Sequence, residues 1–345
     1  MTEKSASIQL PKSVTIKEVA RHLNVSPSTI SRALGRPELL SEETRSRVLE
    51  AVEALGYQPN LIARGLRMQE TRLLFVVVPT LSPFFLEVFR GVERAAVDTG
   101  YAVLMGHTER DPDREHRFFD QVASQRADGI ILVTSSDHER LVARERRMPP
   151  VVVALEHVDG LHAPTVRVDH RRGGIDATNH LLALGHRRIA HVAGPESQAI
   201  AKQRRLGFQE AMVAAGLDPD AYPVVTGPYA VAQGESAMEK LLACNPPPTG
   251  IFAGNDELAI GVVRTAKRVG LEVGRDISVI GFDDQRIASL YEPALTTVKV
   301  PTEELGYQAA LSLIRGLQGK GVQEEIVLQT SIVIRGTTGH APRQA

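Results

Sequence analysis

Two hydroxyl side chains and an arginine stand close together near the start of the chain, at Ser28, Thr29 and Arg32. Residues three or four positions apart share one face of a helix. Short hydroxyl groups let a helix approach base edges in the DNA major groove, and an arginine there can reach a guanine or a phosphate. These residue types at this spacing predict contact with double-stranded DNA.

Two short helices joined by a tight turn would position these side chains. Thr15 can cap the first helix, and Glu18 can reach back to close a capping box. Asn24 suits the turn, where a positive φ is often needed. Ser26 can cap the second helix, and Pro27 takes its first position, where the missing N–H costs nothing. The pattern predicts a helix-turn-helix whose DNA-contact residues include Thr15 and Ser26.

A third helix is predicted from the cap Ser41 to Gly56. Its buried face is expected to comprise four apolar residues: Val48, Leu49, Val52 and Leu55. The alternative is a small helical bundle whose surface carries arginine without binding DNA.

A short segment after the third helix has an apolar residue between cations. Asn60 can cap it, and Ala63, Leu66 and Arg67 follow. A leucine beside arginines can act as a wedge in the minor groove, parting a base step while the cations hold phosphates. Alternatively, Leu66 packs on the next domain.

Beyond Arg72 the pattern changes to short apolar runs that alternate with amphipathic stretches, which is typical of parallel strands buried on both faces. The predicted strands are Leu73–Val78, Ala102–Met105, Gly129–Val133, Val151–Leu155, Ile189–Ala193, Gly250–Ala253 and Ile277–Phe282. The predicted helices are Phe84–Thr99, Arg114–Arg126, Arg172–Ala183, Arg205–Ala215, Val231–Ala243, Glu257–Val269 and Thr302–Leu317. This alternation is too long for one doubly wound unit, so two are expected.

Ligands of doubly wound lobes bind beyond the carboxyl ends of the strands. Asp283 follows a predicted strand directly, and its carboxylate can accept hydrogen bonds from two neighbouring hydroxyls of a sugar or ribose. Glu156, at another strand end, and Asp169 are further candidates. Asp283 could instead cap the turn that follows the strand.

Several motifs resemble the LacI–GalR family of bacterial transcription regulators, over about Thr15 to Arg335. They include Thr-Ile-Lys-Glu-Val-Ala at 15–20, Val-Ser-Pro-Ser-Thr-Ile-Ser-Arg-Ala-Leu at 25–34, Ala-Arg-Gly-Leu at 63–66, Gly-His-Arg-Arg-Ile at 185–189 and Ile-Gly-Phe-Asp-Asp at 280–284. Within the family, the chain is most similar to the subgroup of nucleoside and purine repressors.

The resemblance implies an α/β protein: an all-α helix-turn-helix headpiece, a hinge helix, and two doubly wound parallel-sheet lobes arranged as in periplasmic binding proteins. The expected parts are a flexible tail at 1–14, the headpiece at 15–58 and the hinge at 59–71. The N-terminal lobe is expected at 72–167 with 298–326, and the C-terminal lobe at 168–297 with 327–340. The chain would cross between lobes near 166–170, 297–301 and 325–330.

The same resemblance implies an effector site between the lobes. Arg204 matches the family's ligand arginine and Asp283 its sugar-hydroxyl aspartate. Phe84 could stack on a base, with Phe85 in the core, and Tyr229 and Asn255 match further contacts. Asp256 is expected to cap the helix 257–269. Gln198 and Ile200 stand where purine repressors fix the base, which argues against purine recognition in that manner.

Composition fits a soluble globular protein of the cytoplasm, and the resemblance to DNA-binding regulators implies association with the nucleoid. The 345 residues allow two or three domains and carry a net charge of −1, so charge alone does not indicate DNA. The single Cys244 fits a reducing compartment, and no signal-peptide pattern or membrane-spanning run is present. No catalytic, metal or cofactor motif is found, so neither an enzyme nor a cofactor is expected.

The expected partners are an operator, a second copy of the chain, and a nucleoside or sugar effector, with an inducer favoured over a corepressor. Two alternatives share features of the sequence. One is a solute-binding receptor with the same lobes, and the other is a DNA-binding regulator controlled by a partner protein. The operator, the effector and the choice between dimer and tetramer stay open.

Overall fold

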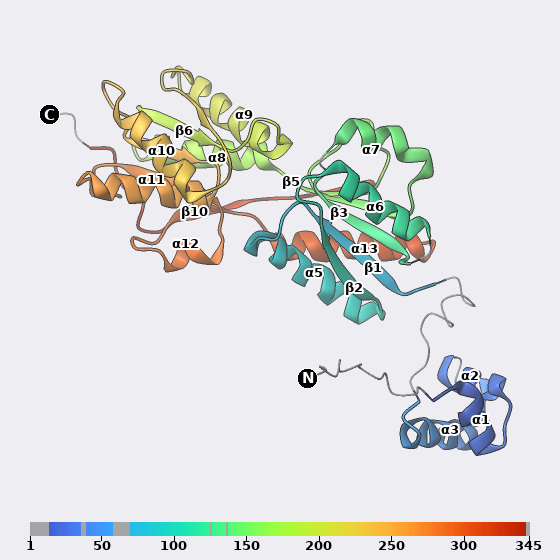
Figure 1. Ribbon diagram of the computed structural model, residues 1–345. Helices are drawn as coiled ribbons and strands as arrows, with labels where there is room; N and C mark the ends of the chain where they lie inside the picture. The colour runs from blue at the N-terminus through green and yellow to red at the C-terminus, as the bar shows by residue number, and fades with distance from the viewer. Residues whose placement is uncertain (1–13, 36–38, 58–69, 125, 136, 343–345) are drawn as a thin grey trace, which may run out of the picture. The chain divides into compact units, whose positions relative to one another are not determined.

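The computed structural model describes residues 14–35, 39–57, 70–124, 126–135 and 137–342. The chain divides into two compact units, Met1–Thr71 and Arg72–Ala345, and Figure 1 shows their elements. The predicted hinge residues Asn60, Ala63, Leu66 and Arg67 lie outside the described residues.

Among its described residues, the first unit contains three α-helices: α1 (Ile16–Leu23), α2 (Pro27–Gly35) and α3 (Glu42–Ala54). The capping box at the start of α1 is confirmed, since Thr15 accepts from the Glu18 backbone and Glu18 accepts from the Thr15 backbone. Asn24 ends α1 with a φ of 51°, in the left-handed region that asparagine tolerates. The Ser26 hydroxyl accepts from the Thr29 backbone at 3.1 Å, which confirms it as the cap of α2.

The three helices enclose a small apolar core. Its fully buried members are Val19, Ala20, Ile30, Ala33, Val48 and Ala51. The prediction that Leu49 belongs to this core is wrong, because the side chain is 42% exposed. Val48, Ala51, Val52 and Leu55 form the stripe at helical spacing, and Leu49 lies about 100° of helix rotation away from Val48.

In the described part of the second unit there are two six-stranded sheets, one in each lobe. The N-terminal lobe holds the parallel sheet with strand order β11-β5-β4-β3-β1-β2. Its strands are β1 (Leu73–Val78), β2 (Ala102–His107), β3 (Gly129–Val133), β4 (Val151–Leu155), β5 (Thr165–Val168) and β11 (Glu325–Leu328). Its helices are α5 (Pro83–Thr99), α6 (Pro112–Ala123), α7 (His138–Arg144) and α13 (Thr302–Leu317), with the 3-10 turn η2 (Glu145–Arg147).

The C-terminal lobe holds the sheet with order β12-β10-β9-β8-β6-β7, in which only the β10–β12 pair is antiparallel. Its strands are β6 (Ile189–Ala193), β7 (Val225–Thr226), β8 (Gly250–Ala253), β9 (Ser278–Asp283), β10 (Thr296–Lys299) and β12 (Ser331–Val333). Its helices are α8 (His170–Ala183), α9 (Ala199–Ala214), α10 (Val231–Leu242), α11 (Asp256–Arg268) and α12 (Arg286–Leu290).

The chain passes between the lobes three times: between β5 and α8, between β10 and α13, and between β11 and β12. All three passages fall inside the predicted ranges. Strand β10 runs to Lys299 and β11 to Leu328, so each ends two residues beyond the boundary expected from the sequence.

Helix α13 returns to the N-terminal lobe and packs along α5, as Figure 1 shows. A Cβ atom added at Gly91 would lie 1.9 Å from the carbonyl oxygen of Glu303, and one added at Gly306 would lie 1.9 Å from that of Val88. Glycine is therefore required at both positions for the two backbones to approach this closely. This packing fixes the helix that follows the second passage of the chain against the helix that follows β1.

Candidate functional site

Helix α2 carries the predicted DNA-reading residues on the side away from the core. Ser28 and Arg32 are exposed and Thr29 is half-buried, while Ile30 and Ala33 face inward. The Ser26 hydroxyl lies 2.7 Å from that of Ser28. An exposed arginine one turn after short hydroxyl groups is suited to base edges and phosphates.

The residues that cap the helices already have local partners. Thr15 shares its hydroxyl with Glu18, and Ser26 bonds Thr29. Their hydroxyl oxygens cap the N-termini of α1 and α2. A phosphate could therefore be bound by their backbone N–H groups or by the hydroxyl hydrogens.

Arg204 and Asp283 form a buried ion pair in the C-terminal lobe, although 79 residues separate them. Arg204 Nη2 lies 2.9 Å from Asp283 Oδ1, and the two side chains are 3% and 9% exposed. The guanidinium also donates to the Gly254 carbonyl and lies 3.7 Å from the centroid of the Phe282 ring. The pair therefore stands at the carboxyl ends of β8 and β9, where the fold rule places ligands.

The environment of Asp283 opposes its charge. Burial raises the pKa of Asp283 to about 6, although the neighbouring Arg204 acts in the opposite direction. The residue also has a φ of 109°, which a non-glycine residue adopts only when its surroundings enforce it. A strained, buried carboxylate at a strand end is an arrangement that recurs in ligand sites.

Tyr229 lies close to this pair. Its hydroxyl oxygen is buried and has no hydrogen-bond partner among the described residues, and burial raises the pKa of its phenol. The charges of Arg204, Asp283 and Arg110 all act on Tyr229. A buried hydroxyl without a partner costs free energy, so a ligand that supplied one would be favoured here.

The prediction that Asp256 caps α11 is wrong. Asn255 is the cap, with its side-chain oxygen 2.9 Å from the Leu258 backbone nitrogen. Asp256 is fully buried and accepts from the Thr297 hydroxyl and from the Gln285 backbone. The backbone of Asn255 is extended whereas Asp256 is already helical, and only a residue outside the helix can cap it.

Two of the remaining predicted cleft residues, Glu156 and Asp169, have hydrogen bonds within the N-terminal lobe and at the start of α8. Glu156 is buried and accepts from Ser135 N at 2.6 Å and from His138 Nε2 at 3.0 Å. Asp169 caps α8 by accepting from Arg172. Gln198 precedes α9 without a side-chain capping bond, and Ile200 lies on α9 one turn before Arg204.

Phe84 packs in the main core of the second unit together with Phe85. Both side chains are 8% exposed, and their rings meet edge to face with centroids 5.2 Å apart. The two rings are therefore equally buried at the start of α5 and both belong to the apolar core.

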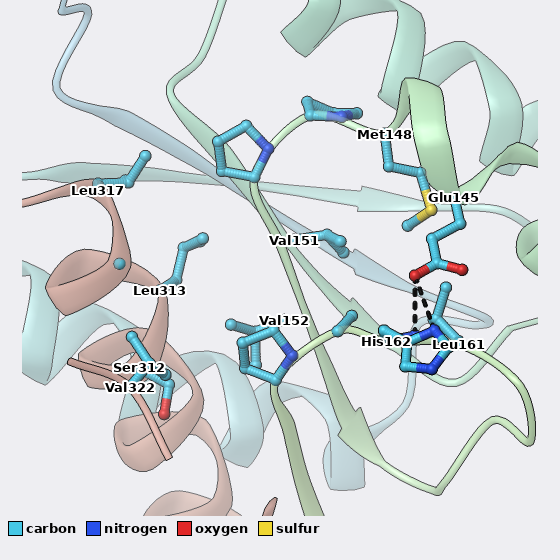
Figure 2. A pocket seen from close by; sticks show the side chains of 15 residues that line it. Glu145, Met148, Val151, Val152, Leu161, His162, Ser312, Leu313, Leu317 and Val322 are labelled. Atoms are coloured by element: carbon cyan, nitrogen blue, oxygen red, sulfur yellow. Dashed lines mark hydrogen bonds and ion pairs between the residues drawn. The ribbon is translucent and has the colours of Figure 1, made fainter. Parts of the chain in front are cut away.

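A cavity of about 340 Å³ lies away from all these residues. Figure 2 shows it between the start of β4 and the end of α13, with mostly apolar residues around it and Glu145 bonded to His162 at its edge. It stands at the amino ends of β4 and β5, opposite the edge where doubly wound lobes bind ligands. We therefore do not assign it to the effector site.

One charged residue near Tyr229 was missed by the sequence analysis. Arg110 follows β2, and partial enclosure by protein lowers the pKa of its guanidinium. The strand-end rule that selected Asp283 would also have selected Arg110, but a run of charged residues resembles an ordinary solvated loop.

Comparison with known proteins gives two family matches. Residues 15–60 match "Bacterial regulatory proteins, lacI family", and residues 178–338 match "Periplasmic binding protein-like domain". The first match spans α1 to α3, and the second spans most of the C-terminal lobe and α13.

Curated relatives match nearly the whole chain. The HTH-type transcriptional repressor CytR of Escherichia coli (strain K12) is 36% identical over 331 residues, covering 95% of this chain and 97% of that protein. The ribose operon repressor of the same strain is 34% identical over 325 residues, covering 93% and 98%.

Solved structures agree over the same length. The lac repressor dimer bound to operator and the anti-inducer ONPF has a TM-score of 0.87 at 28% identity, covering 95% of this chain and 100% of that one. The complex of the transcriptional regulator CelR with cellobiose has a TM-score of 0.71 at 29% identity, covering 94% and 99%. The chain therefore belongs to the lacI family of bacterial regulatory proteins.

Proposed function

We propose that this chain is a transcriptional repressor that binds a palindromic operator as a dimer and is released by a nucleoside or sugar. The proposal that a small effector binds this chain rests on the buried Arg204–Asp283 pair at the carboxyl ends of β8 and β9. The proposal that the chain binds an operator rests on the exposed Ser28 and Arg32 of α2. The site of action is then the cytoplasm, at the nucleoid.

The ion pair suits a ligand rich in hydroxyl groups. Asp283 is an acceptor for neighbouring hydroxyls, and the planar guanidinium of Arg204 donates in a fixed direction. Because Gly254 and Phe282 also contact Arg204, the donor is held in place before the ligand arrives. Preorganised polar groups bind with less loss of conformational entropy.

The DNA contact follows from symmetry and from α2. Two headpieces related by a two-fold axis bind a two-fold symmetric site, with Ser28, Thr29 and Arg32 contacting bases in each half. Leu66 and Arg67 would act at the centre of the operator. Leu66→Ala is expected to reduce operator affinity and DNA bending, and unchanged bending would reject the wedge.

The switch acts through the three passages between the lobes. A ligand held by the C-terminal lobe and contacted from the N-terminal lobe favours one arrangement of the two. It can change DNA affinity only through its different affinity for the two arrangements.

The test is calorimetry with cytidine, other nucleosides, ribose and glucose on the wild type and on Asp283→Asn. We expect at least one compound to bind the wild type and the variant to lose that binding. Asp276→Asn is the matched control, because Asp276 lies on the surface of the same lobe, paired with Arg275. Binding of no compound would favour control by a partner protein, and equal binding to Asp283→Asn would remove Asp283 from the site.

A further inference from the structure

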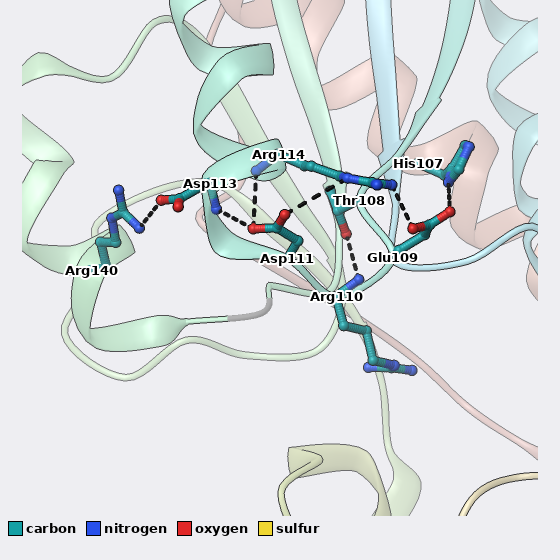
Figure 3. Close-up of polar contacts among 8 residues, drawn as sticks. All are labelled: His107, Thr108, Glu109, Arg110, Asp111, Asp113, Arg114 and Arg140. Carbon is teal, nitrogen blue, oxygen red and sulfur yellow. Dashed lines mark hydrogen bonds and ion pairs between the residues drawn. The ribbon is translucent and has the colours of Figure 1, made fainter.

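The loop between β2 and α6 and the first turn of α6 are rich in charge, and most of their charged side chains pair with one another. Arg114 lies 2.6 Å from Glu109 and 3.7 Å from Asp111, and Arg140 of α7 lies 2.7 Å from Asp113. Figure 3 shows this network, with the side chain of Arg110 pointing away from it. Arg110 makes no ion pair with any residue that the structure describes.

The backbone of the loop determines this direction. Glu109 and Arg110 have φ values of 53° and 58°, a left-handed conformation that non-glycine residues rarely adopt and seldom twice in succession. The buried hydroxyl of Thr108 accepts from the Arg110 backbone nitrogen at 3.2 Å, which stabilises the turn. Strain of this kind persists where the surroundings enforce it, often at ligand sites.

Arg110 follows the carboxyl end of β2, at the same edge of the N-terminal sheet as Glu156 after β4, and such lobes bind ligands beyond this edge. Its charge acts on Tyr229 and Glu156, and protein around the guanidinium lowers the pKa of Arg110 even though the side chain remains exposed. Tyr229 in turn is acted on by Arg110 and by the Arg204–Asp283 pair. One buried tyrosine hydroxyl is therefore within electrostatic reach of a cation from each lobe.

The local anions do not neutralise this cation. Glu156 is occupied by Ser135 and His138, and Asp283 by Arg204. Among the described residues, the Arg110 guanidinium is thus a cation at this edge of the sheet without an ion pair of its own.

We propose that Arg110 is a specificity-determining residue of the effector site and binds a phosphate or carboxylate group of a hydroxyl-bearing effector. This inference rests on the proposed function and names the charge of the ligand. The guanidinium fork matches the two oxygens of either anion. In this arrangement, Arg204 and Asp283 hold the hydroxyl-bearing end and Arg110 holds the anionic end, so the ligand joins the lobes.

The experiment compares neutral and charged members of matched pairs by calorimetry. The probes are cytidine and its monophosphate, ribose with its phosphate and ribonate, and glucose with its phosphate and gluconate. We expect a charged member to bind about tenfold or more tightly than its neutral partner, because a hydrogen bond to a charged group is worth about that factor. Comparing the sugar phosphates with ribonate and gluconate shows whether the site prefers a phosphate or a carboxylate.

Two variants locate the preference. Arg110→Gln keeps a long polar side chain without the charge. In this variant the ratio of the affinities for the charged and the neutral compound is expected to fall to about one, while the neutral compound still binds. Arg114→Gln removes a paired cation from the adjoining first turn of α6 and is expected to leave the ratio of affinities unchanged.

The outcomes separate this inference from the proposed function. If neutral compounds bind as tightly as charged ones, or if Arg110→Gln keeps the preference, Arg110 does not select an anion, although the effector site stands. If no probe binds, both proposals fail. Loss of the preference in both variants would indicate a general effect of loop charge and would also overturn the assignment.

Discussion

Replacement of Gly194 by alanine is a direct test of where the Tyr229 ring lies. Gly194 follows β6, and an added Cβ would lie 2.2 Å from the ring carbon Cζ and 2.3 Å from the hydroxyl oxygen of Tyr229. Carbon atoms pack best at about 3.5–4.0 Å, so the ring would have to move by more than about 1 Å. Gly194 does not have a positive φ, and the effect is therefore steric.

The expected result is a loss of about 1–3 kcal/mol in the free energy of unfolding, the usual effect of overpacking. Effector binding should weaken as well, because the hydroxyl of Tyr229 is displaced. Chemical denaturation followed by circular dichroism measures the first effect, and calorimetry measures the second. Gly321→Ala is the matched control: nothing lies within 4 Å of its Cβ position, so the change should stay within about 0.5 kcal/mol.

A double-mutant cycle decides whether the ring is the cause. In a Tyr229→Ala background the added methyl group has room, so Gly194→Ala should be nearly neutral there. The two changes should therefore couple by about 1 kcal/mol or more. If their effects on unfolding add without coupling, the ring does not lie against Gly194 and the geometry of the site is wrong.

Two further predictions concern other parts of the chain. Arg32→Ala should relax base preference at one position in each half-site, by roughly 1–3 kcal/mol if its contact with guanine is bidentate; binding to a library of operator variants measures this, and uniform weakening at all positions would assign Arg32 to phosphate. The hydrogen bond to Glu156 raises the pKa of His138. The interaction of protonated His138 with Glu156 therefore stabilises the folded state fully below the unfolded pKa of histidine, about 6.5. This stabilisation is lost as the pH rises through the higher pKa of the folded state. The difference in unfolding free energy between the wild type and His138→Gln should therefore shrink as the pH is raised through this range. A difference that stays constant with pH would show that the His138–Glu156 interaction does not stabilise the fold.

Elements with a strong local signal could be predicted from the sequence. The apolar run at Leu73–Val78 and the amphipathic stretch at Thr302–Leu317 have the predicted bounds, because burial on both faces or on one helical stripe leaves a clear pattern. Strands β5 and β10 were missed. Each has four residues, including threonine with arginine or lysine, and pairing with neighbours rather than local pattern makes them strands.

The site was predictable only in part, and for a related reason. Asp283 was selected by its place after a strand, but its pairing with Arg204 spans 79 residues and leaves no local signal; the resemblance supplied Arg204. Asn255 and Asp256 are both good caps, and only the backbone geometry shows which one lies outside the helix. Arg110 looks like its charged neighbours in sequence, and only the structure shows that its guanidinium, unlike that of Arg114, forms no ion pair with a described residue.

The most direct test of the account is operator binding with and without effector. Genomic fragments selected by the purified chain would be titrated by fluorescence anisotropy, alone and with the compound found by calorimetry. The account predicts binding of two chains to a two-fold symmetric site, an affinity that falls when effector is added, and no such fall for Asp283→Asn. Equal affinity with and without bound effector, or binding without sequence preference, would contradict it.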